Sequence, residues 1–281
     1  MAYVNDVASI NVLQGYSKKI QTAYVKESLV ASRLSSDYEF FGAKTVRVMN
    51  PQTVPMSNYS RTGTNRYGTP TEMQDLVQEL TCTQDKSFSL TIDEGNYEDQ
   101  GHLKRARQML SLQMAERAIP EMDKYLLTKL VAEAGNKKTD TAPTKSNIVA
   151  RISLGTIALD DAEVPESGRT LFINATQYNN LKNSEEFIKI ERLGDKALSK
   201  GVVGEFDGMQ VVKIPAGRLP EGMNFLIVHK NAAVAPVKID KTFLHQNPPG
   251  INGNLLEGRQ YYDCFVFTAK ENGVYADVTT T

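Results

Sequence analysis

The chain has 281 residues, of which 41% are hydrophobic and 23% charged, and its formal net charge at pH 7 is −1. These are ordinary values for a globular protein that buries a substantial core in one large domain or two coupled ones. The near-zero charge gives no global reason to expect a polyanion-binding protein, so any contact with nucleic acid must be local.

The sequence contains only two cysteines, Cys82 and Cys264, which lie far apart and beside strand-forming residues. This favours reduced, half-buried thiols in a cytosolic setting over a disulfide framework or a metal site. The N-terminus lacks the basic region and apolar core of a signal peptide, and no window approaches the roughly 20 apolar residues of a membrane-spanning helix. Secretion and membrane insertion are therefore not expected.

The chain begins with a weakly amphipathic segment, residues 7–34, which we interpret as an extended arm carrying some helix. Further along, residues 44–49 (KTVRVM) and 88–92 (FSLTI) alternate polar and apolar side chains, which predicts two strands of a long hairpin. Between these strands, residues 50–71 contain three prolines and two glycines but almost no aliphatic residue. Such a loop cannot bury itself, so its length indicates function or mobility. The returning limb, residues 72–85, is more regular.

The clearest element is a long helix predicted over residues 102–134, where apolar side chains recur every three or four positions. A helix of that length would extend about 50 Å. Pro120 lies inside it and predicts a kink at residues 116–120, while Gly135 is placed to cap its end.

A polar linker, residues 136–145, leads into a segment with α/β character. Ser146 is expected to cap a helix over residues 147–158, and a glycine-rich stretch, residues 193–208, is expected to be a mobile loop. The last strands, residues 261–269 and 273–278, are expected to form an antiparallel pair. The other elements predicted here are strands at 170–173, 210–214 and 225–228 and a short helix at 175–183.

This order of elements resembles the major capsid protein fold of tailed bacteriophages, the Hong Kong ninety-seven-type fold of class α+β. A local pattern adds to the resemblance: residues 204–212 (GEFDGMQVV) are followed by Pro215, Gly222, the apolar run 225–228 and then 232–234. By resemblance, residues 1–43 form the N-terminal arm and 44–93 the extended E-loop. Residues 94–145 and 236–281 form the peripheral domain with a spine helix at 102–134, and 146–235 form the axial domain.

The resemblance implies a structural protein that tiles an icosahedral shell as hexamers and pentamers around the phage genome. In that family the E-loop lies across an adjacent subunit, so Tyr59, Arg61, Arg66 and Tyr67 are the expected inter-subunit contacts. The implied partners are other copies of the chain, a portal protein, packaged double-stranded DNA and no membrane. Some members begin with a scaffolding segment that a protease removes, whereas this sequence starts close to the arm, so a separate scaffolding protein or unaided assembly is expected. The implied location is the virion, after assembly in the host cytoplasm, and no cofactor is implied.

A physical argument independent of the resemblance also favours self-assembly. Long exposed strands, and an arm with scattered apolar residues, promote aggregation unless another chain covers them. Each extension would bind a different surface of the neighbour, and such heterologous contacts close into rings or propagate.

Basic residues in two places could face packaged DNA through sequence-independent phosphate contacts. The helix dipole disfavours cations at the start of the long helix, so basic residues there suggest an external anionic partner. A solvated face, or ion pairs to a neighbouring subunit, explains these residues equally well. The candidates are Lys18, Lys19, Lys104, Arg105 and Arg107.

No motif indicates an enzyme or a metal protein. The three histidines, His102, His229 and His245, have no ligand partners at metal-binding spacing. Residues 201–204 (GVVG) lack the Lys-Ser or Lys-Thr of a phosphate loop. An acidic cluster could bind a cation, but a solvated helix end is the favoured interpretation. That cluster consists of Asp160, Asp161, Glu163 and Glu166.

Two alternatives remain open at this point: an encapsulin-like nanocompartment, which shares the fold but normally has a shorter E-loop, and an α/β enzyme using residues 146–235. Some shells of the family lock neighbouring subunits by an isopeptide bond from an E-loop lysine. Residues 50–71 contain no lysine, and Lys44 and Lys86 lie near the hairpin base, so a non-covalent shell is expected.

Overall fold

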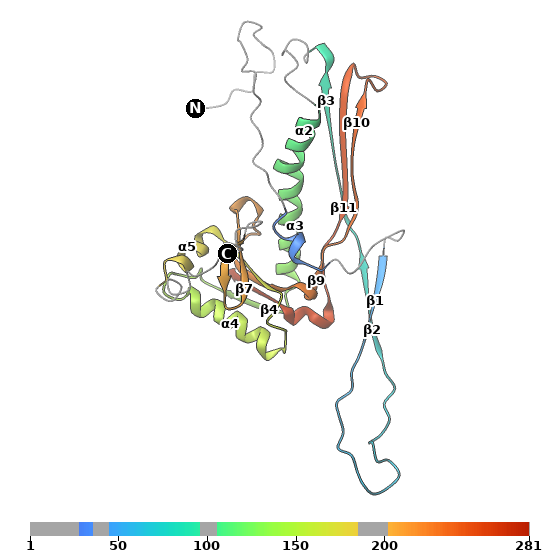
Figure 1. The fold of residues 1–281 in the computed structure, drawn as a ribbon, viewed down its shortest axis with the longest axis vertical. Coiled ribbons are helices and arrows are strands. Elements are labelled where there is room, and N and C mark those ends of the chain that lie inside the picture. Colours follow the sequence, from blue (N-terminus) through green and yellow to red (C-terminus); the bar gives the residue numbers. More distant parts are fainter. Residues whose placement is uncertain (1–27, 36–44, 96–105, 185–201, 281) are drawn as a thin grey trace. The chain divides into compact units, whose positions relative to one another are not determined.

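The computed structural model describes residues 28–35, 45–95, 106–184 and 202–280. It contains two compact units, which are considered separately below (Figure 1). The first unit comprises residues 1–28, 85–122 and 239–261, and the second comprises residues 29–84, 123–238 and 262–281. Most of the predicted arm lies outside the described residues. Both helices and sheets are present, as the α+β prediction requires.

The second unit is built on a six-stranded mixed sheet with the order β4-β13-β8-β5-β7-β6. β5 runs parallel to β7 and β13 runs parallel to β4, while the other neighbours are antiparallel. β5 and β8 are buried along almost their whole length, which explains their nearly continuous apolar sequences. The strands predicted at 170–173, 210–214 and 225–228 are confirmed. In sheet order the strands are β4 (Asn136–Asp140), β13 (Val274–Thr279), β8 (Met223–His229), β5 (Arg169–Asn174), β7 (Met209–Ile214) and β6 (Val202–Phe206).

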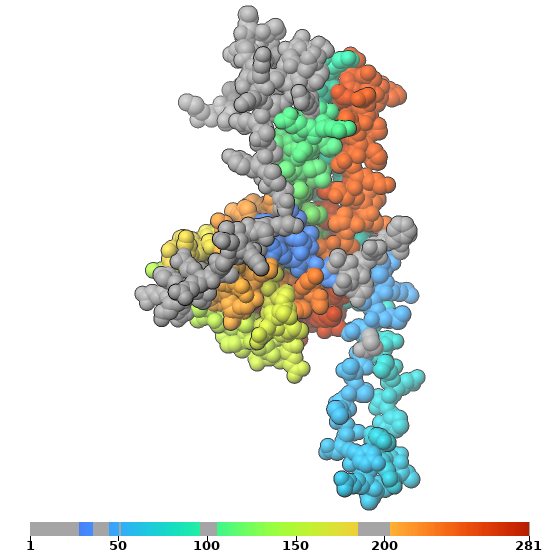
Figure 2. All heavy atoms as spheres, in the orientation of Figure 1, coloured from blue at the N-terminus to red at the C-terminus, as the bar shows by residue number. Residues whose placement is uncertain are grey.

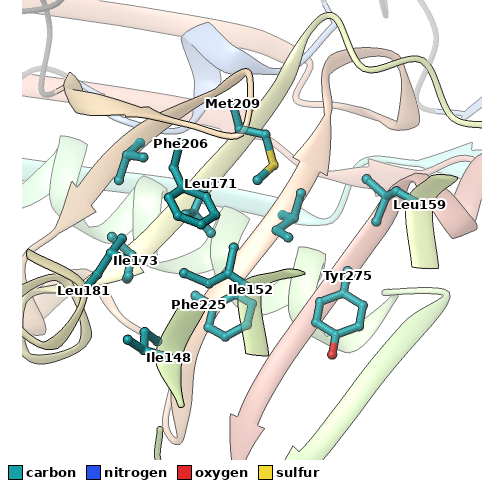
Figure 3. Close-up of a cluster of buried hydrophobic side chains, with 12 residues drawn as sticks. Ile148, Ile152, Leu159, Leu171, Ile173, Leu181, Phe206, Met209, Phe225 and Tyr275 are labelled. Atoms are coloured by element: carbon teal, nitrogen blue, oxygen red, sulfur yellow. The ribbon is translucent and has the colours of Figure 1, made fainter. Parts of the chain in front are cut away.

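Helix α4 (Ile148–Asp161) supplies much of the core of this unit (Figure 3). Ile148, Ile152 and Leu159 recur on one helical face and pack with buried residues of the sheet. Gly155 lies on the same face, where a Cβ atom would come within 2.7 Å of Ile227 Cδ1. A larger residue at this position would therefore push the helix off the sheet. The shorter helix α5 (Ala175–Lys182) adds Leu181 to the same core.

A buried ion pair fixes α4 to the last strand. Arg151 donates from Nε and Nη2 to Asp277 Oδ2, at 2.9 and 2.7 Å. Asn224 Nδ2 donates to the other carboxylate oxygen at 2.9 Å. Both oxygens of this fully buried carboxylate thus have donors, which offsets the cost of taking the charge out of water.

Three local predictions in this unit are wrong. Part of the expected mobile loop forms β6, which joins β7 through the turn Asp207–Gly208, where both residues have positive φ (51° and 72°) as an Asp-Gly hairpin turn requires. The final strands do not pair with each other, because β12 (Phe265–Val266) pairs with β9 (Ala233–Val234) and β13 joins the large sheet. The residue that precedes α4 is Asn147, not Ser146.

The predicted long helix is present from Ala106 to Ala132, as α2 (Ala106–Gln113), the π-helical turn η2 (Met114–Ala118) and α3 (Ile119–Ala132). In η2 the Ile119 N–H bonds to Met114 O, and Pro120, which has no N–H to donate, follows at once. The irregularity expected at residues 116–120 is therefore a widened turn. Gly135 does not adopt the left-handed conformation of a helix cap. Instead its N–H donates to Glu271 O at 3.1 Å, and a Cβ atom at Gly135 would clash with the Glu271 backbone.

The first unit contains a three-stranded sheet with the order β10-β11-β3, formed by β10 (Val237–Gln246), β11 (Gly253–Tyr262) and β3 (Gln84–Asp93). Gly258 is required here because the Phe88 ring lies where its Cβ would be, 2.2 Å away. Arg259 holds the Asp85 carboxylate through Nε and Nη2, at 2.9 and 2.6 Å. The strand predicted at 88–92 is thus confirmed, but its assignment to a hairpin with residues 44–49 is wrong.

The remaining short elements are η1 (Ala31–Arg33), η5 (Ala216–Arg218), η6 (Lys230–Ala232) and η7 (Thr268–Gly273). Asp123, fully buried in α3, accepts the Leu29 N–H at 3.0 Å and an Nη1–H bond from Arg218, so it ties the start of the described chain to the long helix. In the ranges that the structure describes, every helix is too short or too polar to cross a bilayer.

Candidate assembly interface

The most unusual feature is a long hairpin, residues 45–81, in which β1 (Thr45–Pro51) pairs with β2 (Asp75–Thr81). The register places Thr45 opposite Thr81 and Arg47 opposite Glu79. The two threonine hydroxyls lie 2.8 Å apart, and Arg47 Nε donates to Glu79 Oε1 at 2.7 Å. Both charged side chains are exposed, so this ion pair contributes at most about 1 kcal/mol and serves mainly to favour the register.

The base of the hairpin is attached to the second unit by Gln78. Its Nε2 donates to Val266 O and its Oε1 accepts from Thr268 N, both at 3.0 Å. The Gln78 side chain thus makes the two hydrogen bonds to the backbone of residues 266 and 268 that a neighbouring strand would otherwise make. Val48 and Leu80 on the same face of the ladder are buried. The base is therefore part of the folded unit.

Asp263 provides a second attachment just beyond β2. Its buried carboxylate accepts four hydrogen bonds: from Thr83 N at 2.7 Å, Thr83 Oγ1 at 2.9 Å, Tyr125 Oη at 2.7 Å and Cys264 N at 2.8 Å. Burial, together with the hydrogen bond to Asp263, raises the pKa of the Tyr125 hydroxyl above its ordinary value. The end of the hairpin is thus joined to α3 through one carboxylate.

The hairpin tip, residues 52–74, has an internal structure of its own. Gln52 N donates to Gln74 O at 2.9 Å, which closes the ladder. Beyond this bond, the rings of Tyr59 and Tyr67 meet edge to face, with centroids 5.1 Å apart, and Ser60 N donates to Arg66 O at 2.9 Å. The tip is therefore a shaped turn that could be presented to a partner.

Most of the large apolar side chains of the hairpin are exposed, apart from those at its base. Met56 is fully exposed and Tyr67 is 85% exposed. Figure 2 shows the distal part of the hairpin, in blue, as a thin double strand without a covering layer from its own unit. A surface of this kind on one element marks a site of protein–protein contact. The exposed set is Met49, Val54, Met56, Tyr59, Tyr67, Met73, Leu76 and Val77.

The four predicted contact residues, Tyr59, Arg61, Arg66 and Tyr67, all belong to the hairpin tip, where all four are exposed. Among the predicted DNA-facing residues, Arg107 is exposed in the first turn of α2. The other four, Lys18, Lys19, Lys104 and Arg105, lie outside the described residues.

The remaining chemical groups have structural partners. His229 is largely buried, with Nε2 donating to Ser167 O at 3.1 Å and Nδ1 accepting from Asn231 N, and burial lowers its pKa. Cys82 and Cys264 are both buried, and burial raises the pKa of Cys82 to about 11. Within the described ranges, acidic and metal-binding side chains form no group placed to hold a metal ion.

Sequence reasoning missed two features. The hydrogen-bonded Asp263 left no local signal, because its side-chain donors, from Tyr125 and Thr83, lie 138 and 180 positions away in the chain. An exposed apolar stripe on α4, formed by Ala150, Leu154 and Ile157, was hidden because apolar residues occupy both faces of that helix.

Neither a protein-family model nor a curated protein sequence matches the chain. Solved structures do match. A chain of Mycobacterium phage Che8 aligns with a TM-score of 0.74 at 19% identity, over 98% of both chains. The capsid structure of cyanophage P-SCSP1u aligns with a TM-score of 0.74 at 14% identity, over 96% of this chain and 93% of that chain. The mature capsid of bacteriophage PhiM1 aligns with a TM-score of 0.69 at 12% identity, over 100% and 99%. The fold is therefore that of tailed-phage capsid structures, as predicted.

Proposed function

We propose that this chain is a major capsid protein, which assembles into the icosahedral head shell of a tailed bacteriophage and has a structural role. The observation that carries the proposal is the hairpin: its base is fixed by Gln78 and Asp263, while its tip exposes large apolar side chains. On a fold shared with two phage capsid structures, a neighbouring copy is the natural cover for that tip.

In this proposal the hairpin is the projecting part of the E-loop, which lies across an adjacent copy in hexamers and pentamers. The proposed domain bounds remain 1–43 for the arm, 44–93 for the E-loop, 94–145 with 236–281 for the peripheral domain and 146–235 for the axial domain. Tyr59, Arg61, Arg66 and Tyr67 are the proposed contacts.

A portal protein, a separate scaffolding protein and packaged DNA are the proposed further partners, and the virion is the proposed location. Arg107, with the four basic residues outside the described ranges, is proposed to meet DNA phosphates without reading sequence. The encapsulin and enzyme alternatives gain no support, because the structures reported above include phage capsids.

The proposal is tested by removing the tip alone. Residues 53–73 are replaced by Asn-Gly, which keeps the Gln52–Gln74 bond and permits a tight two-residue turn. We expect wild-type protein at micromolar concentration to form shells, tubes or rings in the electron microscope, and the shortened variant to remain unassembled with an unchanged thermal transition. A wild-type protein that sediments as a monomer at all concentrations and salt conditions would refute the proposal.

A further inference from the structure

The outer face of α4 is a second exposed apolar surface, distinct from the hairpin. Its inner face packs into the core, but Ala150, Leu154 and Ile157 follow each other along the opposite side at positions i, i+4 and i+7. Leu154 is 47% exposed and Ile157 is 51% exposed. These three residues are called the α4 stripe. Figure 2 shows the yellow-green atoms of α4 at the surface of the unit.

Negatively charged side chains follow the α4 stripe at the C-terminal end of the helix. Asp161 is the last residue of the helix, and Glu163 and Glu166 follow it, all three exposed. Asp160 differs, because Arg169 Nη2 donates to its carboxylate at 2.6 Å. The C-terminus of a helix carries partial negative charge, so carboxylates there are repelled by the dipole and favour an incoming cation. The last turn of α4 contains no basic residue that could supply one.

The hairpin tip has the complementary chemistry. Residues 52–74 contain two arginines, Arg61 and Arg66, no lysine and a single acidic residue, Glu72, which lies near the ladder end of the tip. Arg66 Nε donates to Gly63 O at 3.2 Å, which leaves the rest of its guanidinium for other acceptors. The same tip carries the exposed side chains of Met56 and Tyr67.

We propose that, in the assembly, the hairpin tip of one copy docks on the α4 stripe of another copy, with Arg61 and Arg66 against the carboxylates that follow it. This inference rests on the proposed function and names the surface that receives the tip. The other exposed apolar residues outside the hairpin, such as Leu90 and Phe243 on β3 and β10, lie on strands whose exposed charges include both signs. The α4 stripe is bordered at its C-terminal end by carboxylates alone, so charge complementarity selects it.

The first experiment uses engineered cysteines. Both native cysteines are buried, so Met56→Cys and Leu154→Cys introduce the reactive thiols at exposed positions. The two single variants are mixed, assembled and oxidised, and the matched control replaces Leu154→Cys by Lys182→Cys, exposed at the end of α5. We expect a reducible dimer at least about tenfold more abundant with position 154 than with position 182. Shells that form without this preference overturn the inference but leave the proposed function standing.

The second experiment reverses charge. We expect Asp161→Lys with Glu163→Lys to lower the assembled fraction at least about tenfold, because like charges would then face each other across the contact. Adding Arg61→Glu and Arg66→Glu should restore assembly, whereas the control Glu221→Lys on the same unit should change nothing. Equal assembly by the Lys variant and the wild type, or loss without rescue in variants with unchanged thermal transitions, overturns the inference. Absence of wild-type assembly would instead refute the proposed function.

Discussion

At the scale of single residues, buried carboxylates hold the second unit together. Asp263, Asp123 and Asp277 are each almost fully buried, and each accepts hydrogen bonds from residues distant in the sequence. A buried carboxylate is costly unless its oxygens are occupied, so each of these sites depends on all of its donors. Nothing in the local sequence distinguishes these aspartates from solvated ones, which explains why only the structure identifies them.

Replacing Asp263→Ala would leave Thr83 N, the Tyr125 hydroxyl and Cys264 N without their acceptor. We expect the free energy of unfolding to fall by about 3 kcal/mol, since each buried unsatisfied group costs about 1–3 kcal/mol. Denaturant unfolding measures the change, and Asp161→Ala, at an exposed position, should stay within about 0.5 kcal/mol of wild type. Equal stability of both variants would show that the Asp263 hydrogen bonds are dispensable.

Cys82 gives a prediction for alkaline pH. Burial first, and the nearby Asp263 carboxylate second, raise its pKa from the ordinary 9.0 to about 11. The folded chain therefore keeps the proton at pH values where the unfolded chain loses it, and stability that is complete below pH 9 is lost as the pH rises towards 11. We expect the free energy of unfolding to fall between about pH 9 and about pH 10.5. In Cys82→Ala the fall should be smaller; an identical fall would show that other groups cause it.

At the scale of elements, local patterns predicted what the elements are better than which elements pair. Alternation correctly placed strands at 44–49 and 88–92, and the helical period placed the long helix. The predicted hairpin partner of β1 was β3, and this prediction was wrong. The true partner, β2, has a less regular sequence pattern than β3, and only the strand pairing in the structure shows which of the two lies beside β1. β13 likewise joins β8 and β4 through contacts that no local signal encodes. For the candidate interface, the strand at 44–49 alternates polar and apolar residues, whereas the following loop has almost no aliphatic residue. This contrast was enough to predict an exposed tip, but not its Tyr59–Tyr67 contact.

The apolar face of the long helix can now be tested at a defined position. Leu126 is 1% exposed, whereas Thr128, two residues further in α3, is exposed. We expect Leu126→Asp to lower the free energy of unfolding by about 4 kcal/mol, because it buries an unpaired charge. Thr128→Asp is the matched control and should change it by less than about 1 kcal/mol. Thermal unfolding followed by circular dichroism compares the two, and similar transitions would mean that the helix turns its other face to the core.

At the scale of the whole molecule, the question is how copies stay joined. The hairpin tip contains no lysine, and Lys86, on β3, lies 3.1 Å from Glu121 in an ion pair. A guanidinium remains protonated and cannot serve as the nucleophile of an isopeptide bond. The apolar side chains and arginines of the tip instead favour burial and charged hydrogen bonds across the contact.

We therefore expect purified mature particles, boiled in detergent, to give one band near the chain mass of 31.2 kDa. Omitting reductant should not alter the pattern, because both cysteines are buried. A ladder of oligomers that survives boiling and reductant would show covalent cross-links and contradict the expectation.

The hairpin has a genetic consequence. Because its tip lies outside the core of its own copy, a substitution at Met56 or Tyr67 yields a chain that still folds and accumulates. Under the proposed function, such a chain enters growing shells through its intact surfaces and stalls them, so the mutant allele is dominant over wild type in a mixed infection. A substitution at a core position such as Leu159 removes the chain by misfolding before it meets a shell, and that allele is recessive.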